Sequence, residues 1–179
     1  MIVRPTVVLS LEDCVDASFA GNYTVEPAEN PVSVKSRTGI IIVLAGCPLI
    51  WKSQIQSSIA LSTFHSECVR LSHSMRILIP LRALLLVVIA ILDLPPAIAS
   101  TIPYHVHEDN ASALLLANSQ HLNNRNKYLA VKLHHFWSRA KLVVIEVVKC
   151  DSKLMLADTF TKPLVREVFE RLRLSIMGW

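Results

Sequence analysis

One apolar segment, residues 77–94, limits the possible folds of this chain more than any other part of the sequence. Its central ten residues, 83–92, carry no charge, and Arg82 and Asp93 flank them. A helix that crosses a bilayer needs about 20 apolar residues, which is twice this length. Pro80 lies shortly before these ten residues and favours the start of a new helix there. We therefore expect a buried helix of a globular protein, with a membrane-associated fragment as the less favoured alternative.

The composition agrees with a folded protein. The chain has 179 residues, of which 52% are hydrophobic and 18% are charged, and this excludes a wholly disordered chain. We expect one domain over residues 1–179, with its core at about 7–164 and a final helix at 165–179. The four cysteines are far apart and form no Cys-x-x-Cys pair, which argues against a disulfide scaffold or a zinc finger. A reduced intracellular setting, cytoplasmic or nuclear, is expected.

The hydrophobic pattern predicts an α/β fold. Strands are expected at 7–15, 39–45, 48–55, 104–107 and 141–148, and helices at 63–79, 80–92, 111–117, 128–139, 153–160 and 166–177. Thr63 is the expected cap of the first helix, and a tight turn at 46–48 joins the second and third strands. Strands that come in a hairpin series and are followed by helices favour a five-stranded mixed sheet, three strands antiparallel, flanked by helices.

Four acidic residues fall at particular points of these elements. Asp16 and Asp109 follow predicted strands, whereas Glu67 and Asp158 lie in predicted helices. Carboxylates that meet at one edge of a sheet repel one another and need a compensating cation, and Mg²⁺ is the usual ion where phosphates are the substrate. Acidic residues at strand ends are also common as solvated caps, so their spacing alone leaves both readings open.

Six short motifs follow one another along nearly the whole chain. They lie at 14–21, 33–39, 46–53, 60–63, 108–113 and 157–164. The fifth contains Asp-Asn-Ala-Ser-Ala, and the sixth contains Ala-Asp-Thr-Phe-Thr-Lys. In these segments the sequence resembles the ribonuclease H domain of copia-type LTR retrotransposon polyproteins.

The resemblance implies a fold, a reaction and a set of site residues. The fold is ribonuclease H-like, and the reaction is hydrolysis of the RNA strand of an RNA/DNA hybrid with two Mg²⁺ ions. Position by position, the resemblance assigns Asp16, Glu67, Asp109 and Asp158 as the catalytic, metal-binding residues. One ion is expected to activate a water near the scissile phosphate, and the other to stabilise the departing 3′-oxygen.

The chain departs from the family pattern in three places. The family's Thr-Glu-Ala-Glu-Tyr run appears as residues 64–68, Phe-His-Ser-Glu-Cys, in which Glu67 keeps the second Glu and His65 replaces the first. The family's Lys-His-Ile-Asp appears as Lys-Tyr-Leu-Ala at 127–130. Family members usually carry polar residues after the Leu-Arg pair at 81–82, where this chain is apolar. A helix that is apolar all round needs a partner or exposes an apolar patch, so a reverse transcriptase domain against 81–92 is a possible partner.

Basic residues predict contacts with nucleic acid. Residues 121–179 hold 11 Lys and Arg against 5 Asp and Glu, so positive charge gathers in the last third of the chain. The residues expected to contact phosphates of a hybrid duplex are Lys52, Arg125, Lys127, Lys132 and Lys162. A catalytically inactive retrotransposon remnant that at most binds nucleic acid is the main alternative to the enzyme.

Overall fold

The structure is a computed structural model that describes residues 9–23, 27, 29–95, 98, 102–119, 129–143 and 145–178. Within these ranges the elements are β1 (Leu11–Ser18), β2 (Arg37–Leu44), β3 (Cys47–Ile55), α1 (Thr63–Ile91), β4 (Tyr104–Glu108), α3 (Ala111–Ser119), α4 (Ala130–Val143), β5 (Ile145–Lys149), the 3₁₀ helices η2 (Ser152–Leu154) and η3 (Leu156–Phe160), and α5 (Arg166–Met177). Of the strand predicted at 7–15, residues 7 and 8 lie outside the described residues, residues 9 and 10 are not in a strand, and β1 ends later than predicted, at Ser18.

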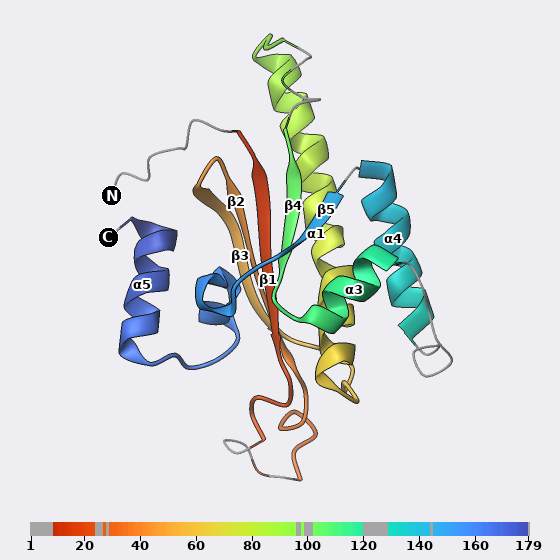
Figure 1. Ribbon diagram of the computed structural model, residues 1–179, viewed down its shortest axis with the longest axis vertical. Coiled ribbons are helices and arrows are strands. Elements are labelled where there is room, and N and C mark those ends of the chain that lie inside the picture. Colours follow the sequence, from red (N-terminus) through yellow and green to blue (C-terminus); the bar gives the residue numbers. More distant parts are fainter. Residues whose placement is uncertain are drawn as a thin grey trace.

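The five strands form one mixed sheet in the order β3-β2-β1-β4-β5, seen in Figure 1. Strand β2 pairs antiparallel with β1 and with β3, whereas β4 pairs in parallel with β1 and with β5. Ala45 and Gly46 connect β2 to β3 with φ of 49° and 79°, the left-handed backbone that a two-residue hairpin requires. The predicted fold class is therefore confirmed.

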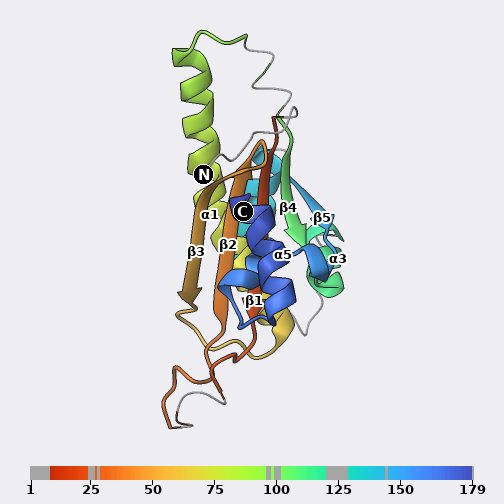
Figure 2. The ribbon, with the colours of Figure 1, turned by 90° about the vertical axis from the view of Figure 1, so that its left-hand side faces the viewer.

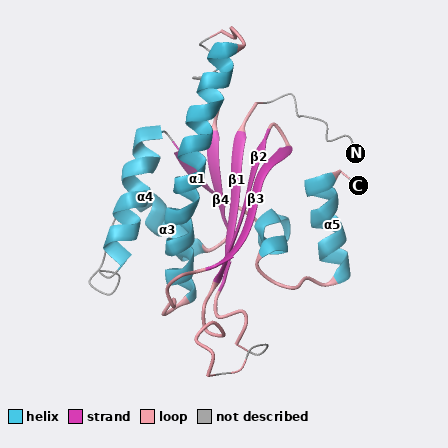
Figure 3. Ribbon diagram, turned by 180° about the vertical axis from the view of Figure 1, so that it is seen from behind, coloured by secondary structure: helices cyan, strands magenta, loops and turns pink. Residues whose placement is uncertain are grey.

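The two faces of the sheet carry different layers. Successive side chains of a strand point to opposite faces, so Ile40 and Ile42 pack with α1, α3 and α4, whereas Ile41 and Val43 pack with the segment around η3. Figure 3 shows α1, α3 and α4 together on one side, and Figure 2 shows α5 in front of the other face. The predicted site residues of α1 and of η3 therefore approach the sheet from opposite sides.

Helix α1 is continuous, which corrects the prediction of two helices separated at Pro80. The helix runs over 29 residues with Pro80 inside it and exposed to solvent. A proline in a helix removes one backbone hydrogen bond, but Leu78 before it and Leu81 after it both pack on the main core, and this packing holds the two parts together. Ser62, rather than the expected Thr63, caps the helix, because its hydroxyl accepts a hydrogen bond from the His65 amide at 3.1 Å.

The apolar end of α1 is mostly exposed, so the expectation of a buried helix is wrong there. The helix projects beyond the sheet (Figures 1 and 2), and Leu84, Val87 and Ile91 are 58%, 53% and 76% exposed. Among the described residues, α1 alone is long and apolar enough to cross a membrane. Its most apolar 18 residues have a mean hydropathy of 2.2 and are 22% buried. Core helices of soluble proteins also meet this test, so it is weak support for a membrane span.

The chain after β5 also differs from the prediction. The helix expected at 153–160 is replaced by η2 and η3, because Met155 between them is extended and its side chain is fully buried. Helix α4 extends to Val143, beyond the expected end at 139, and β5 correspondingly starts at Ile145. This short, irregular region matters because η3 carries one of the predicted site residues.

Candidate functional site

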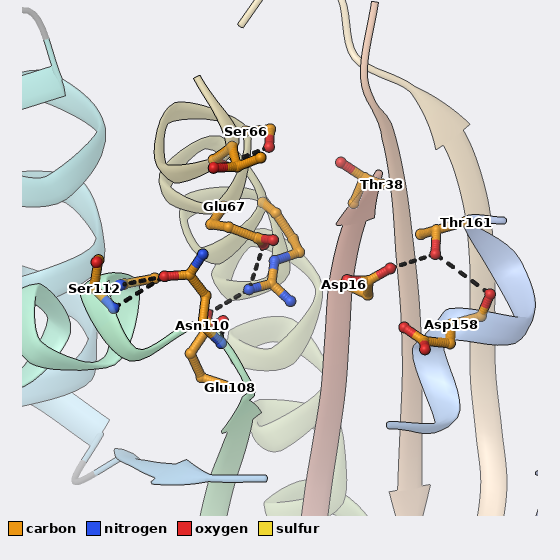
Figure 4. Close-up of polar contacts among 12 residues, drawn as sticks. Asp16, Thr38, Ser66, Glu67, Glu108, Asn110, Ser112, Asp158 and Thr161 are labelled. Carbon is orange, nitrogen blue, oxygen red and sulfur yellow. Dashed lines mark hydrogen bonds and ion pairs between the residues drawn. The ribbon is translucent and has the colours of Figure 1, made fainter. Parts of the chain in front are cut away.

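Asp16 and Asp158 meet on the face of the sheet that η3 covers. Asp16 lies on β1 and is 5% exposed, and Asp158 lies on η3 and is also 5% exposed. The hydroxyl of Thr161 donates a hydrogen bond to Asp16 Oδ2, and the chain turns so that Thr161 Oγ1 is 3.3 Å from the Asp158 carbonyl (Figure 4). Residues 142 positions apart in the sequence are thus held in one cluster.

A glycine on β2 allows this close approach. Gly39 pairs with Asp16 across the β1–β2 ladder. A Cβ added at Gly39 would lie 2.7 Å from the Ala157 carbonyl oxygen and 2.7 Å from Thr161 Cγ2, which is closer than real side chains come. Ser53 on β3 donates a hydrogen bond to the Phe160 carbonyl at 2.6 Å and fixes the same segment from the next strand.

Positive charge reaches this cluster from Lys162. Its Nζ lies 2.9 Å from Asp158 Oδ1. Burial raises the pKa of Asp158 to about 6, and the nearby charge of Asp16 adds to the rise, while Lys162 opposes it. The carboxylates raise the pKa of Lys162 in turn, against the effect of its own burial. A cation beside these two carboxylates is therefore favoured.

Glu67 occupies a second acidic cluster with a guanidinium at its centre. Arg70 Nη2 lies 2.6 Å from Glu67 Oε2 and is also paired with Glu108 Oε2. Figure 4 places Glu67 on α1 and Glu108 at the end of β4, on the other side of β1 from Asp158. The backbone amide of Asn110 donates to Glu108 Oε1 at 3.0 Å. Every charged group in this cluster has at least one partner of opposite charge.

The charges of this second cluster do not balance. Burial raises the pKa of Glu67 to about 8, and Glu108, Asp16 and Asp109 add to the rise although Arg70 opposes it. Burial also raises the pKa of Glu108, again against the effect of Arg70. One guanidinium serves two buried carboxyl groups, so it compensates only one negative charge at a time, and the pair of carboxyl groups retains one proton more strongly than in water.

Asp109 lies between the two clusters in electrostatic terms. It directly follows β4 and is half-buried. Its negative charge raises the pKa of Glu67, of Lys162 and of Cys150, so its carboxylate acts on both sides of the site. Asn110, the next residue, caps α3 by accepting hydrogen bonds from the amides of Ser112 and Ala113 at 3.0 and 3.1 Å.

All four predicted residues offer carboxylate oxygens, the hard ligands that Mg²⁺ prefers. Neighbouring negative charges also raise the pKa values of Glu67 and Asp158, so the donor set fits a divalent cation. Two side-chain cations neutralise them in this arrangement: Lys162 at Asp158 and Arg70 at Glu67. Within the described ranges, no three His, Cys, Asp or Glu side chains form a group that could hold a metal ion. The assignment of Asp16, Glu67, Asp109 and Asp158 as metal ligands stays a prediction.

The predicted basic residues lie in different places. Lys52 on β3 is half-buried, Lys132 on α4 is exposed, and both lower the pKa of His73 on α1, after the larger effect of burial. A cavity of about 170 Å³ lies beside His73 and Lys132. Lys162 is engaged with Asp158. Arg125 and Lys127 lie outside the described residues.

Sequence reasoning missed Arg70, Glu108, Thr161 and Asp13. Arg70 follows Glu67 by three residues on one helix, a spacing that often marks a surface ion pair. Asp13 on β1 is completely buried, and burial raises its pKa to about 7 although Ser74, Arg70 and His107 partly oppose this. The alternation of β1 gave a signal for Asp13, because residues 11, 13 and 15 share the face covered by α1.

A third polar cluster joins the start of β1 to β4. Glu12 Oε2 lies 2.7 Å from His107 Nε2 and 3.1 Å from His105 Nδ1. Burial alone would raise the pKa of Glu12, but hydrogen bonds with His107, Ser10 and His105 lower it to about 2. The parallel register pairs Glu12 with His105, so this cluster is a cross-strand contact of the sheet.

The architecture and a solved structure agree. The solved structure of LC11-RNase H1, isolated from compost, superposes with a TM-score of 0.57 over 92% of this chain and 98% of its own, at 12% identity. This chain has the ribonuclease H fold. At such low identity, the likeness extends to the fold alone. No protein-family model matches the chain.

Two curated relatives connect this ribonuclease H fold with transposons. The chain is 26% identical over 162 residues to the retrovirus-related Pol polyprotein from transposon RE1 of Arabidopsis thaliana, and 27% identical over 162 residues to that from transposon RE2. The match covers 90% of this chain but only 10% of either polyprotein. The expected similarity to retrotransposon polyproteins is confirmed, and the chain corresponds to about a tenth of their length.

Proposed function

We propose that this chain is a ribonuclease H that hydrolyses the RNA strand of RNA/DNA hybrids with two Mg²⁺ ions. The observation that carries the proposal is the meeting of Asp16 and Asp158, from opposite ends of the chain, at one place on a ribonuclease H fold. The charges of Asp16 and Asp109 both raise the pKa of Glu67. The charge of Asp109 also raises the pKa of Lys162, the partner of Asp158.

In this proposal the four carboxylates hold the metal ions, and the remaining residues position them. Bound Mg²⁺ would supply a Lewis acid that lowers the pKa of a water and stabilises the leaving 3′-oxygen. Thr161 keeps the Asp16 carboxylate oriented by its hydrogen bond, and Gly39 lets η3 approach closely enough for this. Lys162 neutralises Asp158 in the structure; if a bound cation took over this role, the Lys162 ammonium would be available to a phosphate of the substrate.

The surface formed by β3, α1 and α4 is the proposed contact for the hybrid. Lys52 pairs across the β2–β3 ladder with Ile40, which packs with α1, and Lys132 lines the same cavity as His73 of α1, so both lysines lie on the side of the sheet that α1 and α4 cover. A duplex of hybrid geometry is held through its phosphates and 2′-hydroxyl groups, which suits a surface of separate cations. Binding through these residues weakens steeply as salt increases.

The exposed apolar part of α1 is the proposed contact for a neighbouring domain of a longer polyprotein, the reverse transcriptase. Leu84, Val87 and Ile91 present an apolar surface, and the curated relatives are about ten times longer than the matched region. Exposed apolar patches of this kind usually mark an interface. Retention of the chain by an immobilised polymerase domain, lost when Leu84 and Val87 are replaced by lysine, tests this contact.

The nuclease proposal is tested by cleavage of a labelled RNA/DNA hybrid with Mg²⁺ and with EDTA. We expect Mg²⁺-dependent cleavage of the RNA strand, and its loss in Asp16→Asn. A fully active Asp109→Asn variant would contradict the assignment of the site. Hybrid binding by folded protein without any cleavage would instead support the inactive, nucleic-acid-binding alternative, which the ion pair of Glu67 with Arg70 favours.

A further inference from the structure

Arg70 places a permanent positive charge on a carboxylate that the proposed function needs for a metal. We propose that Arg70 is an internal competitor of the metal ion: it holds Glu67 in an ion pair, and a divalent cation reaches Glu67 only when this pair opens. The inference rests on the proposed function, because it takes Glu67 as a metal ligand.

The pair is shielded from water. The Arg70 side chain is completely buried, the Glu67 side chain is 7% exposed, and Nη2 lies 2.6 Å from Oε2. Attraction between opposite charges is stronger in a buried, low-dielectric site than at the surface, and salt screens it less. A metal ion that binds Glu67 must therefore displace a partner that is held more firmly than a surface lysine.

Arg70 is fixed from two sides. It follows Glu67 by three residues, so the helix itself brings the two side chains together. Glu108 on β4 pairs with the same Nη2 and is itself completely buried and bonded to the Asn110 amide. Arg70 cannot move away from Glu67 freely, because Glu108 would lose its buried cation.

The cation beside Asp16 and Asp158 is held less firmly than Arg70. The side chain of Lys162 is 44% exposed, so its ammonium can turn from Asp158 into solvent. Lysine is a point charge on a flexible stem, whereas the planar guanidinium of arginine can hold two carboxylates at once. We therefore expect the more tightly bound ion at Asp16 and Asp158, and the more weakly bound ion at Glu67.

The test measures the affinity for Mn²⁺, whose free ion is counted by electron paramagnetic resonance. The double variant Arg70→Met/Glu108→Gln removes one positive and one negative buried charge at similar side-chain volume, and it leaves Glu67 without its competitor. We expect it to bind Mn²⁺ about tenfold more tightly than the original chain, because one charged hydrogen bond no longer has to be broken. Adding Glu67→Gln to the double variant should remove this gain.

The matched control is Arg76→Met, an exposed arginine further along the same helix, which should leave Mn²⁺ affinity unchanged. If the double variant does not fold, Arg70→Lys serves instead, because it keeps a positive charge for Glu108 but cannot hold both carboxylates. A folded variant that binds Mn²⁺ no more tightly, or whose gain survives Glu67→Gln, overturns the inference.

Failure of the nuclease proposal gives a different result. If the variant gains Mn²⁺ affinity through Glu67 but neither protein cleaves the hybrid, the competition by Arg70 stands and the nuclease assignment falls. If the original chain cleaves the hybrid and its variants show no change in Mn²⁺ affinity, the nuclease assignment stands and the role of Arg70 falls.

Discussion

Helix α1 has a polar half, which holds Glu67 and Arg70, and an apolar half, which begins at about residue 83. The two halves reverse the usual relation between hydrophobicity and burial. The first half carries Ser66, Glu67 and Arg70, and all three are buried against the sheet. The second half is apolar throughout 83–92, yet most of it lies in solvent beyond the sheet. Burial here follows the position of the sheet and the pairing of charges, so the hydrophobicity of a segment does not by itself say where it lies.

The largest expected effect is on activity and comes from the polar half. Glu67→Gln removes a carboxylate charge from the proposed metal site, and cleavage of a labelled hybrid should fall by about 100-fold or more. The matched change in the apolar half, Leu84→Ala, should leave the cleavage rate as it is. Equal activity of Glu67→Gln and the original chain would show that the buried polar half of α1 has only a structural role.

The largest expected effect on stability is at Arg70. Arg70→Ala leaves Glu108 buried without a cation, which should lower the free energy of unfolding by about 3–5 kcal/mol in urea denaturation. Arg70→Ala/Glu108→Gln should restore part of this loss, because the unpaired charge is gone. A single variant within 1 kcal/mol of the original chain would disagree with the buried ion pair.

Truncation of leucines on the two halves sharpens the comparison directly. Leu71 is completely buried in the main core, whereas Leu84 is 58% exposed. Leu71→Ala should lower the free energy of unfolding by about 3 kcal/mol, because it leaves a cavity. Leu84→Ala should change it by less than about 0.5 kcal/mol. Similar losses from both would mean that the projecting half of α1 is covered in solution.

The charge of Asp13, opposite the polar half of α1, should make stability depend on pH. Its pKa is raised from 3.8 to about 7, so between these values the unfolded chain has lost a proton that the folded chain keeps. Stability therefore falls as pH rises through this window. Asp13→Asn should flatten this part of the profile, because the titrating group is gone. At pH 8 it should raise the free energy of unfolding by roughly 2 kcal/mol; the gain is no larger because an amide is also costly to bury. Thermal melts from pH 4 to pH 8 measure the pH dependence of stability and the gain at pH 8. A profile that is the same in the variant would show that a group other than Asp13 causes the pH dependence.

The smallest expected effect on folding comes from adding charge to the apolar half. Leu84→Lys/Val87→Lys should leave the melting temperature nearly unchanged, because both positions are more than half exposed. Self-association measured by sedimentation should decrease, because the apolar patch is broken. Recovery of the unaltered chain in the soluble fraction without detergent would exclude the membrane-associated alternative.

Much of the fold was predictable from local sequence. The continuous apolar run at 39–45 predicted a strand, and the break at 46–48 predicted a hairpin, although the turn itself lies one residue earlier, at Ala45 and Gly46. Helix ends and the 3₁₀ region after β5 were less predictable. Met155 interrupts that region because its side chain fills the core below the sheet, and this is a tertiary effect.

The site was predictable only in part, and mostly through the motifs. The candidate site residues Asp16, Glu67, Asp109 and Asp158 were predicted by resemblance and stay a prediction; the pattern alone could not single them out, because strand-end and helical carboxylates are common on any protein. Nothing in the sequence near Arg70 showed that it is buried, because Glu and Arg three residues apart also occur on solvated helices.

The sequence by itself determined the α/β class, the strand pattern and the presence of a basic last third, because these depend on side-chain period and charge along the chain. The tertiary structure decided which half of α1 is buried, that Gly39 admits η3 beside Asp16, and that Arg70 lies between Glu67 and Glu108. These outcomes depend on distances between segments far apart in sequence. Desolvation and ion pairing are set by those distances, and no local pattern contains them.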